Sequence, residues 1–151
     1  MSRLWVDANI ILRFVTKEPP KMAARAAQLM AQAEAGEVSL YIAPLVLAEI
    51  VWVLRSFYQY TMAEIAEVMI ALVSAAGIEV ENRELTIRAL EASRDHNVDY
   101  IDAYLAYQAA AHGERVCTFD TTDFRRLPVD WVAPPESPQD MPSVEGQESA
   151  C

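Results

Sequence analysis

The segment Leu4–Leu12 reads L-W-V-D-A-N-I-I-L, and its two halves have different patterns. Arg3–Val6 is short and largely apolar and is followed by Asp7, which is typical of a buried strand with an aspartate at its carboxyl end. Ile10–Val15 then has the apolar spacing of one or two helical turns. Because a strand that leads directly into a helix is the repeating unit of α/β proteins, we expect further strands and helices to alternate along the chain.

The rest of the chain continues this alternation. Thr61 and Glu64 form an S/T-x-x-E capping box at the start of one helix, while Asn82 and Asp99 are suitable N-caps for two others. The predicted helices cover residues 20–35, 45–58, 61–77, 82–96 and 100–112, and the later strands cover 38–42, 77–80, 115–118 and 131–132. We therefore expect a three-layer α/β/α fold around a mostly parallel sheet of four to five strands.

Composition indicates one globular domain followed by a tail. The 151 residues are 53% hydrophobic and 23% charged, which is the balance of a folded protein. After Val132 the sequence becomes rich in Pro, Ser, Gln and Glu, and this tail holds four of the eight prolines. We expect a folded domain over residues 1–133 and an acidic, proline-rich, disordered tail over residues 134–151.

The sequence also indicates where the protein works. Its longest apolar runs, Ile42–Ala48 and Met69–Gly77, fall short of the ~20 residues that a membrane helix needs. No charged segment followed by an apolar one stands at the start, so we expect a cytoplasmic protein without a signal peptide. Cys117 and Cys151 have the spacing of neither a zinc site nor a disulfide framework.

The net charge of −10 bears on how the protein could bind nucleic acid, which is itself negatively charged. The tail carries four acidic residues and no Lys or Arg; without it, 18 acidic residues face 12 basic ones, a net charge of −6. This balance argues against tight non-specific binding of nucleic acid. It is compatible with a metal-dependent nuclease of small footprint, because bound cations cancel part of the charge.

Four carboxylates from distant parts of the sequence are expected at one edge of the sheet. Asp7 and Asp120 follow predicted strands, while Glu49 and Asp102 lie in the first turns of helices that begin at the same edge. Two carboxylates about 4 Å apart repel by roughly 4 kcal/mol at an effective dielectric constant near 20, so such a group stays ionised only around a cation. Oxygen-only ligands suit Mg²⁺ or Mn²⁺, and a phosphodiester is the substrate that such an ion would help to hydrolyse.

Each of these acids also has a purely structural interpretation. Asp7 fits a turn or a helix cap, Asp99 fits a cap, and Asp102 fits a first-turn carboxylate that stabilises the helix dipole. Asp120 and Asp123, in T-F-D-T-T-D-F, fit a loop. Glu49 lies among apolar residues of a helix, where a charged group is rarely buried without a partner. It is their expected convergence that favours a functional site.

Four motifs in this chain resemble those of the PIN domain family, and in particular the VapC-like toxins of toxin–antitoxin pairs. They are L-W-V-D-A-N-I-I-L (4–12), L-A-E-I-V-W-V-L (47–54), D-Y-I-D-A-Y-L-A (99–106) and C-T-F-D-T-T-D-F (117–124). The resemblance covers about residues 3–133. The family pattern places its acids at Asp7, Glu49, Asp102 and Asp120, with Asp123 as a frequent additional ligand of the metal. Ala8 departs from the Thr or Ser that is common there.

The resemblance implies an endoribonuclease that depends on Mg²⁺ or Mn²⁺, forms a homodimer and is inhibited by an antitoxin protein that binds near the site. Asn9 and Thr118 resemble the supporting polar residues of the family. Basic residues near the expected edge would contact RNA phosphates, although solvated surface charge is the commoner role for each: Arg13, Lys17, Arg125 and Arg126. Aromatic residues that would suit a dimer face, although core positions are commoner for them, are Trp52, Phe57, Tyr58 and Tyr60.

Two other functions remain open from the residues alone. A phosphatase with Asp7 as nucleophile usually needs a second acid two residues later and a lysine from a later strand. Here Asn9 occupies the first position, and the only lysines, Lys17 and Lys21, precede the second strand. A non-catalytic module whose acidic pocket holds a structural ion or a partner's arginines would have the same acids.

Overall fold

A computed structural model describes residues 2–137 of the chain. The predicted disordered tail, 134–151, therefore lies mostly outside the described residues. The elements, in chain order, are β1 (Ser2–Trp5), α1 (Ala8–Thr16), α2 (Pro20–Glu34), β2 (Val38–Ile42), α3 (Pro44–Ser56), α4 (Met62–Val73), β3 (Ile78–Val80), α5 (Arg83–His96), α6 (Tyr100–Ala111), β4 (Val116–Cys117), α7 (Thr121–Arg126) and β5 (Trp131–Val132). The described part is thus the α/β fold that the alternating pattern predicted.

Local sequence signals explain most helix boundaries. Thr61 and Glu64 form the predicted capping box at the start of α4, and the Asn82 side chain accepts a hydrogen bond from the Leu85 amide at the start of α5. Gly77, with φ +81°, ends the turn after α4. A Cβ atom there would lie 2.3 Å from the Ala33 carbonyl oxygen, so only glycine lets this turn pack against α2.

All strand pairs are parallel, as expected, and they form two separate sheets in the described region. Strand β2 lies between β1 and β3, with Leu40 opposite Leu4 on one side and opposite Ile78 on the other. Strands β4 and β5 form a two-stranded sheet in which Val116 is opposite Trp131. The expected single sheet of four to five strands is thus divided between β1 and β4, because no backbone hydrogen bonds join these two strands.

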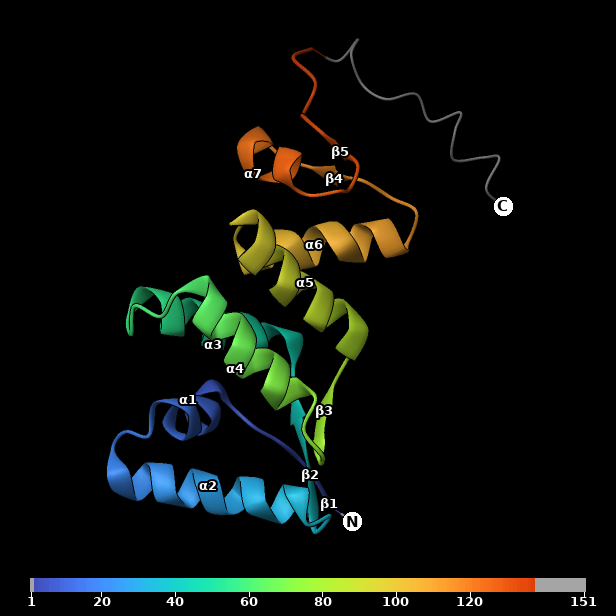
Figure 1. The fold of residues 1–151 in the computed structure, drawn as a ribbon. Coiled ribbons are helices and arrows are strands. Elements are labelled where there is room, and N and C mark those ends of the chain that lie inside the picture. Colours follow the sequence, from blue (N-terminus) through green and yellow to red (C-terminus); the bar gives the residue numbers. More distant parts are fainter. Residues whose placement is uncertain (1, 138–151) are drawn as a thin grey trace.

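The two sheets lie at opposite ends of the molecule (Figure 1). Helices α1 to α4 lie beside the β1–β2–β3 sheet, with α2 packed against β2 and α4 against β3, and the β4–β5 sheet lies with α7 beyond α6. Helices α5 and α6 stand between them; α5 packs against α4, and α6 packs against both α5 and α3. One continuous apolar core joins both ends, from Val6 to Leu127.

Burial differs sharply between neighbouring strands. Every residue of β2 is buried, whereas every residue of β1 is exposed, including Leu4 and Trp5. The sequence indicated a buried first strand, so the exposure of β1 departs from that prediction. None of the helices in residues 2–137 is both long enough and apolar enough to cross a membrane.

Candidate metal centre

Three aspartates form a compact cluster at the carboxyl end of β4. Each offers a carboxylate oxygen within 4.8 Å of the others: Asp102, Asp120 and Asp123. Asp102 lies in the first turn of α6, Asp120 is the N-cap of α7, and Asp123 lies in the first turn of α7. The cluster thus forms where a strand end and the starts of two helices meet.

Short-range hydrogen bonds hold the two α7 acids in place. The Thr118 hydroxyl accepts a hydrogen bond of 2.9 Å from the Asp120 amide, so this threonine supports the acid as the sequence suggested. The Asp120 carboxylate in turn accepts a hydrogen bond of 3.1 Å from the Asp123 amide. Phe124 is fully buried and anchors α7 to the core. The acids are therefore fixed by the backbone, with one oxygen of Asp120 used for capping.

The cluster carries the electrostatic strain expected of closely spaced carboxylates. The pKa of Asp102 is raised from 3.8 to about 6, first by partial burial and then by the negative charges of Asp99, Asp120 and Asp123. A cation among these groups would relieve the repulsion. Because the donors are all carboxylate oxygens, the cluster fits Mg²⁺ or Mn²⁺ better than zinc.

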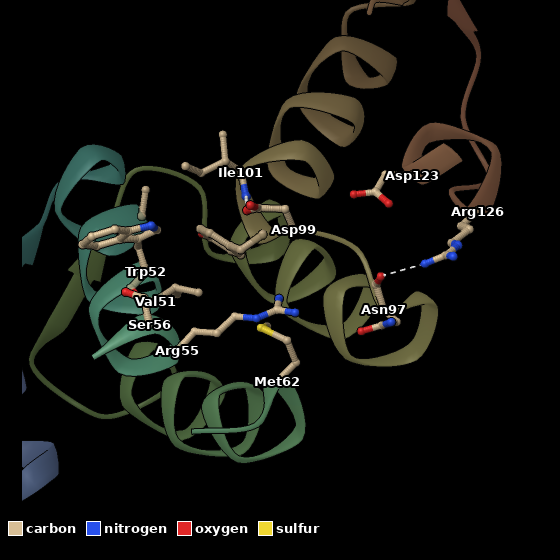
Figure 2. Close-up of a pocket in the computed structure, with 12 residues that line it drawn as sticks. Val51, Trp52, Arg55, Ser56, Met62, Asn97, Asp99, Ile101, Asp123 and Arg126 are labelled. Atoms are coloured by element: carbon tan, nitrogen blue, oxygen red, sulfur yellow. Dashed lines mark hydrogen bonds between the residues drawn. The ribbon is translucent and has the colours of Figure 1, made fainter. Parts of the chain in front are cut away.

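A groove of about 600 Å³ adjoins the cluster and runs between α3 and the start of α6. Figure 2 shows Arg55 reaching into it from α3, with Asp123 and Arg126 on the opposite side. The Arg126 guanidinium donates a hydrogen bond of 3.2 Å to the Asn97 carbonyl, which tethers α7 to the turn before α6. Acidic and basic groups thus share one open groove.

The Asp7 side chain occupies a different place. Asp7 is exposed and is the N-cap of α1, where its carboxylate accepts a hydrogen bond of 3.3 Å from the Ile10 amide. It borders a second cavity, of about 550 Å³, together with Asn9, Arg13 and Arg25. Asp7 does not belong to the aspartate cluster, and its charge is not among those that raise the pKa of Asp102. Its role as a metal ligand stays a prediction.

Glu49 also lies outside the cluster. It is exposed on α3, while its neighbours Ala48 and Trp52 line the groove beside Asp99 and Asp123. The structure therefore brings together three of the five predicted acids and leaves Asp7 and Glu49 apart from them.

The sequence analysis did not single out Arg55 and Asn97, two polar residues that line the groove. Arg55 lies within a largely apolar helical sequence, and Asn97 lies in a turn between two helices, so neither position indicated a site residue. The φ of Asn97 is +52°, a conformation that asparagine tolerates better than most residues. Of the basic residues that were singled out, Arg126 lines this groove, Arg13 borders the cavity at Asp7, and Arg125 lies over the Trp131 ring. Trp52 on α3 and Phe57 directly after α3 are exposed, with 64% and 75% of their surfaces accessible, rather than in the core.

Comparison with known proteins identifies the fold. The family model of the PIN domain matches residues 4–130, which is nearly all of the described chain. No curated protein matched the sequence. The matched region contains the aspartate cluster and all four motifs quoted above. This chain therefore belongs to the PIN domain family, and its fold is a nuclease fold.

Proposed function

We propose that the protein is an endoribonuclease that depends on Mg²⁺ or Mn²⁺ and acts as the toxin of a toxin–antitoxin pair. The observation that carries the proposal is the cluster of Asp102, Asp120 and Asp123, whose carboxylates lie within 4.8 Å of one another at the end of a parallel strand. Together with membership of a nuclease family, this cluster favours phosphodiester hydrolysis over simple binding.

The three clustered aspartates would hold the cation, and Asp7 and Glu49 are proposed as the remaining acids of the site. When bound, the divalent ion supplies an activated water and neutralises charge on the phosphate. Asp102 has to lose its proton to act as a ligand, so its raised pKa makes cation affinity depend on pH near neutrality. Asp120 and Asp123 are held by the start of α7 and need little rearrangement.

The groove beside the cluster would receive the RNA. Arg55 and Arg126 line it and are suited to pair with backbone phosphates, which positions a strand without reading its sequence. Trp52, which is largely exposed on the same groove, offers a flat ring for stacking an unpaired base. A substrate with single-stranded segments fits this arrangement.

The same groove suits an antitoxin segment. An arginine of such a partner would form a charge-assisted hydrogen bond with the clustered carboxylates and so exclude both cation and RNA. The exposed Trp52 and Phe57 would add apolar contact area, either for this partner or for a homodimer. We place the protein in the cytoplasm, where such partners and RNA occur together.

The first experiment is to incubate the purified protein, free of antitoxin, with a mixed structured RNA, with and without Mg²⁺ or Mn²⁺. Asp120→Asn is the test variant, and Asp130→Asn, an exposed acid outside the cluster, is the matched control. We expect metal-dependent cleavage by the wild type and the control and none by Asp120→Asn. Cleavage that is equal in all three proteins, or absent from a folded wild type with either metal, would overturn the proposal.

A further inference from the structure

The pair of helices α1 and α2 carries positive charge in an otherwise acidic protein. Residues 8–34 contain four basic residues and two acidic ones, Glu18 and Glu34, so the α1–α2 pair has a net charge of +2 in a chain of −10. The basic residues are Arg13, Lys17, Lys21 and Arg25. None of them forms an ion pair with an acid of residues 2–137. The overall charge therefore conceals a local surface that suits an anionic partner.

The cavity of about 550 Å³ beside Asp7 lies on this α1–α2 pair. Arg13 lines it from α1 and Arg25 lines it from α2, so guanidinium groups from both helices share one cavity. Its other polar residues, apart from Asp7, carry side-chain amides: Asn9, Gln28 and Gln32. Guanidinium groups match the geometry of phosphate oxygens, and amides donate to phosphates or to base edges. The cavity thus offers several hydrogen-bond donors to one phosphate group.

The Arg13 guanidinium is only partly satisfied by the protein. One of its terminal nitrogens donates a long hydrogen bond of 3.5 Å to the Glu18 carbonyl, and its Nε is shielded from solvent without a hydrogen-bond partner in residues 2–137. An unpaired buried N–H costs free energy, and an anion in contact with the guanidinium would offset that cost. Arg13 is half-buried whereas Arg25 is exposed, so Arg25 is the arginine that can be replaced without disturbing the packing of α1.

Polar residues of α2 extend the cavity into a stripe along one face of the helix. The stripe consists of Lys21, Arg25, Gln28 and Gln32, which are all exposed. Intervals of three or four residues place these side chains on the same face of a helix. From its first to its last residue the stripe is about 17 Å long at the helical rise of about 1.5 Å per residue. Met22 and Leu29 also line the cavity and offer apolar contact area beside the stripe.

An elongated anion suits this surface better than a compact one. A free nucleotide would fill the cavity but would leave most of the stripe without a contact. A single RNA strand carries one phosphate per nucleotide and can therefore continue along α2, while its bases lie against Met22 and Leu29. An acidic peptide would match the charge but has no flat bases for these apolar side chains. RNA is thus the ligand that uses the charged, amide and apolar groups together.

The Asp7 carboxylate is the one group of the cavity lining that opposes an anion. It accepts a hydrogen bond of 3.3 Å from the Ile10 amide as the N-cap of α1, so part of its charge is already compensated by the helix. Arg13 and Arg25 line the same cavity and outnumber it by one charge. The cavity therefore keeps a positive balance with Asp7 ionised.

We propose that the α1–α2 pair is a second RNA-binding surface, where Arg13 and Arg25 hold one backbone phosphate and the stripe on α2 holds the adjoining nucleotides of a single-stranded segment. Helix α2 lies at the opposite end of the molecule from α7, which carries two of the clustered aspartates (Figure 1). The α1–α2 pair and the groove beside the cluster would thus contact different segments of one RNA. The choice of RNA rests on the proposed nuclease function, but the binding itself can be measured without cleavage.

The test measures the affinity of the full chain for a labelled single-stranded RNA of about ten nucleotides with a 5′-hydroxyl end, a length within the usual site sizes of single-strand binders. Fluorescence anisotropy is recorded in a chelator, so that no cleavage occurs, at several salt concentrations. Arg25→Gln is the test variant. Arg94→Gln is the matched control, because it removes the same charge from an exposed residue of α5.

We expect Arg25→Gln to bind the RNA about tenfold more weakly than the wild type, as for the loss of a charge-assisted hydrogen bond. The slope of log affinity against log salt should fall by about 0.7, the value for one phosphate contact on a single strand. Arg94→Gln should keep the affinity and slope of the wild type. Equal losses in the two variants would reduce the effect to net charge and overturn the proposal, as would a folded wild type that does not bind the RNA.

Competition then identifies the ligand. Unlabelled RNA should displace the labelled strand at concentrations at least about 100-fold lower than adenosine 5′-monophosphate or a glutamate peptide with the same number of charges, because the strand makes several contacts at once. Equal displacement by the mononucleotide would assign the cavity to free nucleotides, and equal displacement by the peptide would assign it to an acidic protein; either result would overturn the proposal. A wild type that binds RNA through Arg25 but cuts none with Mg²⁺ or Mn²⁺ would instead reject the nuclease function and keep this surface.

Discussion

The two ends of this molecule carry acidic residues in opposite settings: three acids are gathered at one end, and a single acid follows a strand at the other. At the C-terminal end, Asp102, Asp120 and Asp123 lie within 4.8 Å of one another above the buried Phe124. At the N-terminal end, Asp7 follows an exposed edge strand and caps α1. The difference shows that an aspartate directly after a strand is not enough to form an acidic cluster. The elements that carry the other acids must also pack beside the end of that strand.

The largest expected effect is on the rate of RNA cleavage, when an acid of the C-terminal cluster is replaced. Asp120→Asn removes a ligand from the cluster and should lower the rate of RNA cleavage by about 1,000-fold, comparable to the loss of a main electrostatic contact in other hydrolases. Asp95→Asn, an exposed acid on α5, should leave the rate unchanged. Rates are measured at saturating Mn²⁺. A loss of less than tenfold for Asp120→Asn would mean that the cluster is not the reaction centre.

A second contrast concerns two glycines with positive φ. Gly77→Ala would place a Cβ atom 2.3 Å from the Ala33 carbonyl oxygen and should lower the free energy of unfolding by about 3 kcal/mol. Gly113→Ala, in open space before β4, has only the strain of its φ of +69° and should cost about 1 kcal/mol. Urea unfolding measures both. Equal losses would contradict the tight packing of α2 against the β3 turn.

The third prediction uses the raised pKa of Asp102. Because its pKa in the folded protein, about 6, lies above the ordinary value of 3.8, the folded state binds this proton more tightly, and ionisation of Asp102 destabilises the metal-free protein above pH about 6. Asp102→Asn should therefore stabilise the metal-free protein by about 1 kcal/mol at pH about 8, after allowance for solvent screening.

This gain should shrink as the pH is lowered through about 6, since the protonated aspartate then resembles asparagine. Thermal unfolding in the presence of a chelator, at several pH values, measures it. Asp95→Asn is the control: Arg94 lowers the pKa of the Asp95 carboxyl, so its replacement should give no stabilisation. A destabilised Asp102→Asn at pH about 8 would show that the cluster is structural.

The smallest effect is expected at the groove. Arg126→Ala should weaken RNA binding by a few-fold and reduce the slope of log affinity against log salt by about 1, the signature of one lost phosphate contact. Binding is measured without divalent cations so that the RNA stays intact. Arg94→Ala, which removes a surface partner of Asp95, is the control. An unchanged salt slope would place the RNA elsewhere.

Local features of the fold were predictable from the sequence. The strand Val38–Ile42 was predicted with its observed bounds, and the Thr61 capping box and the Asn82 cap start helices where expected. Each depends on residues within a few positions of one another. Helix α7 was not predicted, because D-T-T-D-F has the composition of a loop and becomes helical through the Asp120 cap and the buried Phe124.

Non-local features were harder to predict. The alternating pattern indicated parallel strands, but a sequence does not specify which edges meet, so the division between β1 and β4 was not foreseen. The same limit explains the site: Asp7, Glu49, Asp102 and Asp120 were all expected at one edge of the sheet. The structure gathers Asp102 and Asp120, together with Asp123, from the segment 102–123, whereas the positions of Asp7 and Glu49 depend on how elements far from that segment pack. Arg55 was missed because no pattern showed that α3 faces the groove.

Binding of a divalent cation by Asp102, Asp120 and Asp123 is the central proposal for this protein. The most direct measurement is a titration of Mn²⁺ into the metal-free wild type and into metal-free Asp120→Asn. Binding is monitored by calorimetry or by the loss of the electron paramagnetic resonance signal of free Mn²⁺. We predict saturable binding by the wild type and an affinity at least about tenfold lower for Asp120→Asn. Equal affinities in the two proteins, or no saturable binding by the wild type, would contradict it.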